Sequence, residues 1–329
     1  MIFAPIILLI INFILWKNYQ FLTLKLNLYD TPNDTLKQHK KKISVITGSF
    51  ILINILIIFL SSIFITEIID IFILSNYKVV YLCLAIFLLG YIDDNISLNP
   101  SIRILLFIIF FYLFLFFDSD YLIQNIEIDG YNFTFKHSHA MIFSTLCFLI
   151  YINAFNFFDG VNFQSGIHVV FIYLILLFKL NFSYEISSLL FFYIIFLYFN
   201  GKNMVFLGNS GAYLSATLIS IFLIYYYKKY IFSAAEIFVL MSLPGLDMLR
   251  IFLSRLSKLK NPFNGDLNHI HHLSVKKLGL IRSNILILFT QILNYSFFLI
   301  SKNEIFSICF SIIVYIFLII FIKHQTINE

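Results

Sequence analysis

The sequence predicts an all-α protein that crosses a membrane many times. Of its 329 residues, 60% are hydrophobic and 12% are charged, and the charged share is about half that of an ordinary soluble domain. The apolar residues fall in long runs separated by short polar segments, as expected when each helix needs about 20 mostly apolar residues to span a bilayer. Because no linker or internal repeat divides the chain, we expect one integral-membrane domain over residues 1–329.

The number of apolar segments predicts about eleven transmembrane helices. In chain order they are 2–16, 43–65, 78–92, 101–117, 140–155, 166–178, 186–199, 211–227, 232–246, 284–300 and 305–322. The first segment is not followed by a small-residue cleavage site, so we interpret it as a retained helix and not as a signal peptide.

The basic residues predict the orientation of these helices. With the amino terminus outside, sixteen of the 22 Lys and Arg residues fall in the loops and tail that lie inside, as the positive-inside rule requires. The long outside loop, 118–139, alternates around Asp129-Gly130, which is typical of a short β-hairpin. His137 and His139 follow the hairpin, and we interpret them as solvated side chains and not as a metal pair.

The most informative motif is the acid pair Asp93-Asp94, which ends one apolar run just before the next. A carboxylate at the mouth of a membrane helix is costly unless a cation or a dense set of hydrogen bonds compensates it. Because carboxylates are hard oxygen ligands, the pair favours a Mg²⁺ site that carries a phosphorylated substrate. A solvated loop that holds two acids is the alternative.

Four further polar groups fall in loops predicted on the same side of the membrane. They comprise Asp30, Lys37 and His39; Asn153, Asn156, Asp159 and Gly160; Asn200, Phe206 and Asn209; and Asp247, Arg255, Asp266, His269, His271 and His272. Each group alone has an ordinary explanation as a cap, a turn or a packed side chain. Their location on one face points to a shared site.

The histidine run is the most unusual of these groups. Three histidines within the four residues 269–272 can bind a metal or hold a diphosphate through charge-assisted hydrogen bonds. Zinc has little support because the run has no Cys partner and no HExxH arrangement. Pro244-Gly245 precede the run, and we expect them to bend or break the helix at 232–246.

Taken in order, these motifs resemble those of the polyprenyl-phosphate N-acetylhexosamine-1-phosphate transferases, the WecA/TagO/MraY group of glycosyltransferase family 4. The similar stretches are Asp30-x-Pro32 with Lys37-x-His39, Gly90-x-x-Asp93-Asp94 with Leu98 and Arg103, Asn153-Ala154-Phe155-Asn156-x-x-Asp159-Gly160, Phe206-x-Gly208-Asn209-Ser210-Gly211, Pro244-x-x-Asp247, Arg255, Pro262-Phe263 and Asp266-x-x-His269-x-His271-His272. The histidine pattern is closer to the bacterial WecA-like sugar branch than to the muramyl-pentapeptide branch.

The resemblance implies a reaction and a location. The reaction transfers N-acetylhexosamine-1-phosphate, by default GlcNAc-1-phosphate, from a UDP-sugar to undecaprenyl phosphate, which gives undecaprenyl-diphosphate-sugar and UMP and initiates cell-surface polysaccharide synthesis. It implies Mg²⁺, with Mn²⁺ as a substitute, and no nucleic-acid partner; a homodimer is compatible with it. The implied location is the bacterial inner membrane, with the active site on the cytoplasmic face.

The resemblance also implies residue roles. Asp93, Asp94 and His271 would be catalytic. The nucleotide-sugar would contact Lys37, Asn153, Asp159, Asn200, Phe206, Arg255, His269 and His272, and the metal would contact Asn156 and Asn209 with Asp93 and Asp94. The chain departs from the family pattern at four positions: acids are usual where Ser97, Asn162 and Asn209 stand, and a glycine is usual where Phe163 stands.

Three other readings stay open at this point. The chain resembles a transferase but is compatible with a diverged, weakly active homologue. A polytopic lipid or solute transporter would require charged residues near the bilayer midplane, and Glu236 is the main residue of that kind. An intramembrane prenyltransferase would require a second Asp-rich motif, which the sequence lacks.

Overall fold

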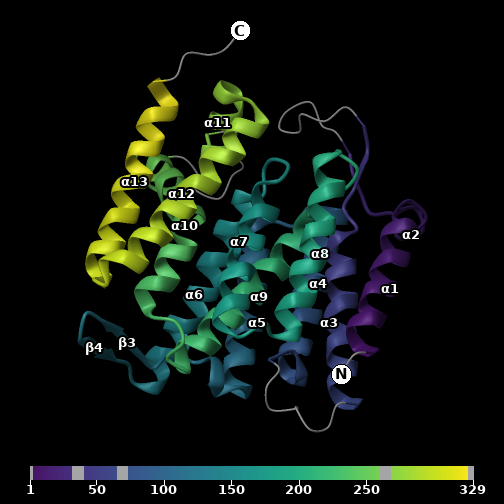
Figure 1. Cartoon of the computed structure of the whole chain (residues 1–329), viewed down its shortest axis with the longest axis horizontal. Helices are drawn as coiled ribbons and strands as arrows, with labels where there is room; N and C mark the ends of the chain where they lie inside the picture. The colour runs from purple at the N-terminus through teal and green to yellow at the C-terminus, as the bar shows by residue number, and fades with distance from the viewer. Residues whose placement is uncertain (1–2, 32–40, 65–72, 260–267, 325–329) are drawn as a thin grey trace. The chain divides into compact units, whose positions relative to one another are not determined.

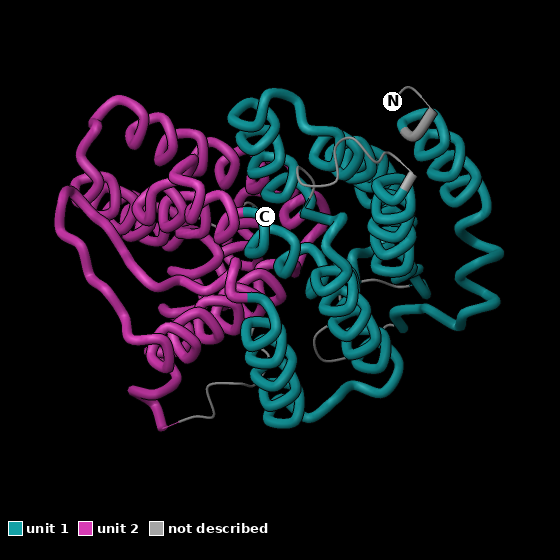
Figure 2. The backbone as a smooth tube through the Cα atoms, turned by 90° about the horizontal axis from the view of Figure 1, so that it is seen from below, with its two compact units in different colours: residues 1–118, 166–222 teal, residues 119–165, 223–329 magenta. Residues whose placement is uncertain are grey.

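The computed structural model describes residues 3–31, 41–64, 73–259 and 268–324. These residues form thirteen α-helices and two small two-stranded sheets (Figure 1). The predicted all-α class is therefore confirmed, and each of the eleven predicted apolar segments falls on a helix. The backbone divides into two compact units, each made of two separate stretches of the chain (Figure 2).

The helices support an integral membrane protein. Among the described residues, eight helices are long and apolar enough to cross a membrane. The count rises to nine if α1 (Phe3–Lys17) and α2 (Tyr19–Leu26), which bend by 69°, form one span. Two of the predicted spans, at 43–65 and 166–178, fold as shorter apolar helices. The count of eleven spans is thus not confirmed, and the orientation stays a prediction.

Unit 1 comprises residues 1–118 and 166–222. Besides α1 and α2 it contains α3 (Thr47–Phe64), α4 (Tyr77–Ile96), α5 (Pro100–Phe117), most of α7 (Gln164–Lys179), α8 (Tyr184–Gly201) and most of α9 (Gly208–Lys228). Strand β1 (Tyr29–Asp30) pairs antiparallel with β2 (Ile43–Ser44). Helix α3 packs against α1, α4 and α8, and the amides of Asn12 and Asn54 bond to each other between α1 and α3, which satisfies both in an apolar setting.

Unit 2 comprises residues 119–165 and 223–329. It contains α6 (His137–Phe158), α10 (Ala234–Leu256), α11 (Ile270–Leu278), α12 (Leu280–Ser301) and α13 (Glu304–His324). Helix α10 packs against α6, α12 and α13. Its apolar core gathers Phe158, Leu243, Ile270, Ile287, Tyr315, Leu318, Ile319 and Ile322. This core fixes the end of α6 and the start of α11, the two segments that carry the predicted site residues of this unit.

The predicted hairpin is present in unit 2. Strands β3 (Asn125–Ile128) and β4 (Tyr131–Thr134) pair antiparallel. The turn residues Asp129 and Gly130 have φ of 46° and 81°, as a type I′ turn requires. The Asp129 carboxylate accepts hydrogen bonds at 2.9 Å from the N–H groups of Glu304 and Ile305. The hairpin therefore also caps the first turn of α13.

Helix α10 corrects one prediction from the sequence. Pro244 lies inside α10, which runs unbroken from Ala234 to Leu256. Of the expected bend or break at Pro244-Gly245, the break was therefore wrong, and the bend stays a prediction. Proline removes one backbone hydrogen bond from a helix interior. Leu243 and Pro244 are both buried, and we attribute the continuity of the helix to this packing.

Candidate functional site

The acid pair of unit 1 lies in the last turn of α4. We call the group of Asp93, Asp94, Arg103, Asn209, Ser210 and Tyr213 the acidic cluster. The Asp94 carboxylate accepts hydrogen bonds from the backbone N–H of Asn209 at 2.7 Å and from that of Ser210 at 3.0 Å, and from the Ser210 hydroxyl at 2.7 Å. The first N–H groups of a helix have no intrahelical partner and favour negative charge. Asp94 is therefore the cap of α9.

Gly208 allows this close approach. Its φ is +71°, and a Cβ there would lie 2.9 Å from Cβ of Val45 and 3.2 Å from an Asp94 carboxylate oxygen. Only glycine adopts this conformation without strain. Phe206, two residues before Gly208, is held by β2 and α3, because its N–H donates to the Ser44 carbonyl at 2.8 Å and its carbonyl accepts from the Thr47 hydroxyl at 2.7 Å. The turn before α9 is thus fixed from both sides within unit 1.

Asp93 organises the other side of the acidic cluster. One carboxylate oxygen accepts the Leu98 N–H at 2.7 Å, which closes the end of α4. The other accepts the Tyr213 hydroxyl at 2.6 Å and Nη1 of Arg103 at 3.2 Å. Arg103 lies in the first turn of α5, and its buried Nε has no hydrogen-bond partner among the described residues. The cluster therefore contains a cation with an unused donor beside two acids.

The same contacts test whether these residues suit a metal. Every carboxylate oxygen of Asp93 and Asp94 already accepts at least one hydrogen bond, and the described residues contain no group of three or more His, Cys, Asp or Glu side chains placed to hold a metal ion. They do not form a preformed cage. Mg²⁺, however, is normally held by one or two protein oxygens plus waters and substrate phosphates. The Asn209 carboxamide, with a remaining lone pair of Asp94, fits that partial role.

Unit 2 holds the second group of predicted residues. We call Asp247, Arg250, His269, His271, His272 and Tyr315 the histidine cluster. The buried Asp247 carboxylate accepts Nδ1–H of His269 at 2.8 Å, Nη2–H of Arg250 at 2.7 Å and the Tyr315 hydroxyl at 2.9 Å. It also accepts a hydrogen bond at 3.2 Å from the N–H of Ile270, the first residue of α11. The carboxylate therefore joins α10, α11 and α13.

The histidine rings stack in series. The His269 ring packs on Phe157 with a centroid distance of 5.5 Å and lies parallel to the His271 ring, also at 5.5 Å. His271 in turn contacts His272 at 4.2 Å. Burial, and secondarily the charges of His272 and His269, hold the pKa of His271 well below its ordinary value of 6.5, with Asp247 opposing the shift. His271 is therefore neutral at pH 7.

The loop after α6 lies against the histidine cluster. A Cβ added to Gly160 would collide with the His271 imidazole, so the close approach depends on the missing side chain. Asp159 accepts a hydrogen bond from the Ser165 hydroxyl, and the Asn162 carbonyl accepts one from the Asn284 carboxamide at 3.0 Å. Contacts from α7 and α12 thus hold this loop within unit 2.

The two predicted asparagines of α6 differ in their contacts. Asn153 donates to the Leu149 carbonyl at 2.7 Å, a bond within its own helix. The Asn156 side chain makes no hydrogen bond to any described residue, so its oxygen and nitrogen are available to a ligand.

The remaining predicted residues are placed as follows. The buried Asn200 carboxamide donates to the Val205 carbonyl at 3.0 Å and closes the loop after α8. Arg255 is buried in the last turn of α10. Lys37, together with His39 and Asp266, lies outside the described residues.

Sequence reasoning gave no role to several residues that the structure brings into these clusters. Tyr213 and Tyr315 lie within apolar helices among many aromatic residues, and no local signal separates them from packed tyrosines. Arg250 follows Asp247 by three residues, a spacing that places two helical side chains side by side, so this pair was open to prediction. Arg103 was noted only as part of the motif.

One comparison with known proteins gives a match. Residues 76–227 match the family described as glycosyl transferase family 4, to which the MraY, WecA and TagO transferases belong. The matched stretch includes the whole acidic cluster and the loop after α6, whereas the histidine cluster lies beyond it. The match supports the resemblance over this stretch and does not distinguish the branches of the family. No curated protein matches the chain.

Proposed function

We propose that this chain is a membrane transferase of glycosyl transferase family 4. It moves N-acetylhexosamine-1-phosphate, by default GlcNAc-1-phosphate, from a UDP-sugar to undecaprenyl phosphate and releases UMP. One observation carries the proposal: the stretch that matches the family contains Asp93, Asp94 and the turn before α9, and these residues are bonded into one cluster. The chain would work in the bacterial inner membrane, at its cytoplasmic face, and start surface-polysaccharide synthesis.

The chemistry is a phosphoryl transfer. An oxygen of undecaprenyl phosphate forms a bond to the β-phosphorus of the UDP-sugar, and the bond from that phosphorus to the bridging oxygen breaks, so UMP leaves with the electron pair. Such reactions need little covalent help from the protein, and positioning with charge neutralisation supplies most of the rate. The protein must therefore hold two phosphorylated substrates and compensate their negative charge.

We assign the lipid phosphate to the acidic cluster. Arg103 offers a guanidinium whose Nε is unused among the described residues, and guanidinium groups bind phosphate well. Asp93 holds that guanidinium at 3.2 Å, and Asp94 fixes the α9 N-terminus, which favours anions. In this proposal the two acids act mainly by placing these positive groups.

The metal is part of the proposal. Asn209 with Asp94 would hold Mg²⁺, or Mn²⁺ in its place, and Asn156 stays a further candidate ligand. Bound with the diphosphate, the ion would neutralise charge on the phosphate oxygens. Asn209 lacks the charge of the acid that is usual in the family, so we expect weak metal affinity in the absence of substrate.

We assign the nucleotide-sugar to the histidine cluster and the loop after α6. His269 and His272, with Arg255, are the candidates for the diphosphate, and neutral His271 is the candidate proton acceptor. Asn153 and Asp159, with Lys37, Asn200 and Phe206, stay candidate contacts of the uridine.

The transporter reading has less support. Among the buried carboxylates of candidate membrane spans, Asp247 lies near the middle of α10 and is bonded to Arg250 and His269. Glu185 and Glu236 lie in the first turns of α8 and α10, near helix ends and not at the midpoints where a transport site is expected. Each has a partner: Glu185 accepts the Leu74 N–H and Glu236 accepts the Tyr295 hydroxyl, both at 2.9 Å. A structural role is sufficient for both.

The test is UMP release by the purified full-length chain. It is incubated in detergent with undecaprenyl phosphate, Mg²⁺ and a panel of UDP-N-acetylhexosamines, beside an EDTA control. Metal-dependent UMP that requires the lipid and disappears in Arg103→Gln supports the proposal. Activity only after Asn209→Asp identifies a diverged, impaired homologue. No UMP with any sugar, in either form of the protein, overturns the transferase proposal.

A further inference from the structure

The Asp247 carboxylate has more partners than the end of a helix needs. It is 2% exposed and accepts from one guanidinium, one phenol, one imidazole and one backbone N–H. The backbone bond to Ile270 alone would cap α11. The other three donors come from three separate elements, which converge on a carboxylate that is expensive to bury.

The partners of Asp247 are bonded to each other as well. Nε of Arg250 donates to the Tyr315 hydroxyl at 2.8 Å, and Nη2 of the same side chain also donates to the Asn268 carbonyl at 2.6 Å. Arg250 therefore fixes both Tyr315 and the residue before His269. The network is closed around Asp247, so its carboxylate has little freedom to turn.

This network determines which nitrogen of His269 is available. Nδ1 lies 2.8 Å from Asp247, and a carboxylate at that nitrogen sets the orientation and tautomer of the ring. Phe157 and His271 both stack on the ring. With Nδ1 taken by Asp247, Nε2 is the nitrogen left for a ligand, and the carboxylate supports a positive charge on the ring when an anion binds.

We propose that Tyr315 and Arg250 are positioning residues for diphosphate recognition: they hold the Asp247 carboxylate, which orients His269 so that Nε2 donates to a phosphate oxygen. The inference rests on the proposed function, because it takes the diphosphate of the nucleotide-sugar as the ligand. The charged and titratable groups around His269 are Asp247 and Arg250 on α10, His271 and His272 on α11, and Tyr315 on α13.

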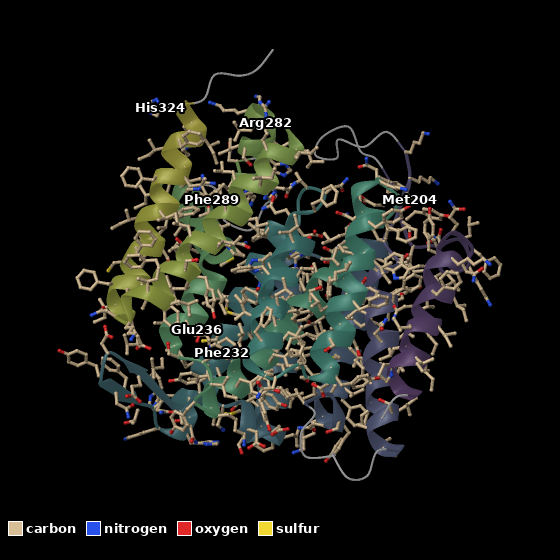
Figure 3. All side chains as sticks on the ribbon, in the orientation of Figure 1. Met204, Phe232, Glu236, Arg282, Phe289 and His324 are labelled. Carbon is tan, nitrogen blue, oxygen red and sulfur yellow. The ribbon has the colours of Figure 1, made fainter. Side chains whose placement is uncertain are left out.

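A purely structural network is the alternative, and unit 2 contains a matched control for it. The Tyr295 hydroxyl donates to the buried Glu236 carboxylate at 2.9 Å, the same chemistry as the bond from Tyr315 to Asp247. Glu236 lies eleven residues before Asp247 in α10, about 16 Å along the helix. Figure 3 shows Glu236, near the start of α10, well separated in this view from Arg282, near the start of α12.

The experiment measures inorganic pyrophosphate binding to the full-length chain in detergent by calorimetry, with EDTA present and no lipid. It compares the wild type, Tyr315→Phe, the control Tyr295→Phe, His269→Gln and the double variant His269→Gln/Tyr315→Phe. We expect Tyr315→Phe to raise the Kd about tenfold, Tyr295→Phe to leave it unchanged, and the double variant to bind no more weakly than His269→Gln. If Tyr315→Phe does not fold, Arg250→Lys gives the same comparison, because lysine cannot reproduce the guanidinium contacts.

Three results would overturn the inference: no pyrophosphate binding by the wild type, equal Kd values for the two tyrosine variants, or a further tenfold loss in the double variant. The UMP assay separates this failure from failure of the proposed function. UMP release with an unchanged Kd in Tyr315→Phe would reject the positioning role and keep the transferase. A tenfold rise in the Kd for pyrophosphate in Tyr315→Phe, together with no UMP release by the wild type, would keep the positioning role and reject the transferase.

Discussion

The acidic cluster of unit 1 and the histidine cluster of unit 2 use buried carboxylates in different ways. In the acidic cluster, the Asp94 oxygens accept hydrogen bonds from the start of α9, and Asp93 pairs with Arg103. The group that remains available to a ligand is the Arg103 guanidinium. In the histidine cluster, Asp247 takes one nitrogen of His269, so the group left over is the other nitrogen. In both, the acid prepares a cationic or polar donor.

The comparison teaches that an acid pair at a membrane surface need not be a preformed metal site. The charge of each acid is compensated within the chain, and what remains suits an anion. Phosphate groups are the anions that both substrates of the proposed reaction carry.

Asp94→Ala should have the largest effect. The substitution leaves three donors at the start of α9 without an acceptor, so we expect unfolding in detergent to become easier by about 2–4 kcal/mol. We expect UMP release to fall at least about 100-fold. Ser210→Ala is the control, because it removes one donor and keeps the carboxylate, at an expected cost of about 1 kcal/mol. Equal effects of the two variants would refute the capping role of Asp94.

Gly160→Ala tests the contact between the loop and the histidine cluster. A Cβ there would collide with His271, and forced overpacking costs about 1–3 kcal/mol. Gly245→Ala is the matched control in unit 2, because no atom lies within 4 Å of its Cβ position and alanine favours the helix. Thermal unfolding should show a loss for the first variant and no loss for the second. A stable Gly160→Ala would contradict the close packing.

The pH dependence of stability should identify His271. Its pKa in the folded protein is well below 6.5, so the unfolded chain binds a proton that the folded chain does not as the pH falls through 6.5. Stability should therefore fall with decreasing pH below that value, by at most about 1.4 kcal/mol per pH unit. This slope is measured as the free energy of unfolding by denaturant at several values from about pH 5 to about pH 7, a range in which histidine changes its charge. His271→Asn should flatten it, and an unchanged slope in that variant would exclude His271 as its source.

Asn209→Asp should have the smallest effect. It adds a carboxylate beside Asp94, whose oxygen lies 2.7 Å from the Asn209 backbone nitrogen. An added charge at such a partly solvated site is worth about 1 kcal/mol for a divalent ion, so the Mg²⁺ concentration for half-maximal UMP release should fall about fivefold. This concentration is measured by following UMP release as Mg²⁺ is added to a buffer free of Ca²⁺. A rise in the required Mg²⁺ would place the metal elsewhere.

Much of the architecture could be predicted because it depends on local signals. Long apolar runs predicted eleven of the thirteen helices of the described residues, all except α2 and α11, and Asp129-Gly130 predicted the hairpin. The effect of packing on a helix is not a local signal: Pro244 was expected to bend or break its helix, and α10 continues through it. The short helices α3 and α7 show why the count of spans is harder to predict than the helices themselves.

The site was predictable to the extent that its residues are unusual in a membrane chain. Acids, amides and histidines stand out among Phe, Ile and Leu, so Asp94 and His271 were singled out as candidates, and their roles stay predictions. Tyr315 was missed because a tyrosine in an apolar helix is common, and only the fold brings it to Asp247. The hydrogen bonds of Asp94 could not be predicted for a related reason: the sequence shows a carboxylate, but not the backbone N–H groups of Asn209 and Ser210 that bond to it. The Mg²⁺ site stays a prediction.

The central claim is that the acidic cluster binds the lipid phosphate and the histidine cluster binds the nucleotide-sugar. Its most direct test is the affinity for a UDP-sugar in the absence of lipid. Binding of UDP-GlcNAc to the full-length chain, with EDTA present so that no metal bridges the two clusters, is measured for the wild type, Asp94→Asn and His269→Gln, each first shown to be folded. We predict that His269→Gln raises the Kd about tenfold or more, and that Asp94→Asn changes it less than about twofold even though it abolishes turnover. Loss of UDP-GlcNAc binding in Asp94→Asn, with normal binding in His269→Gln, would contradict the account.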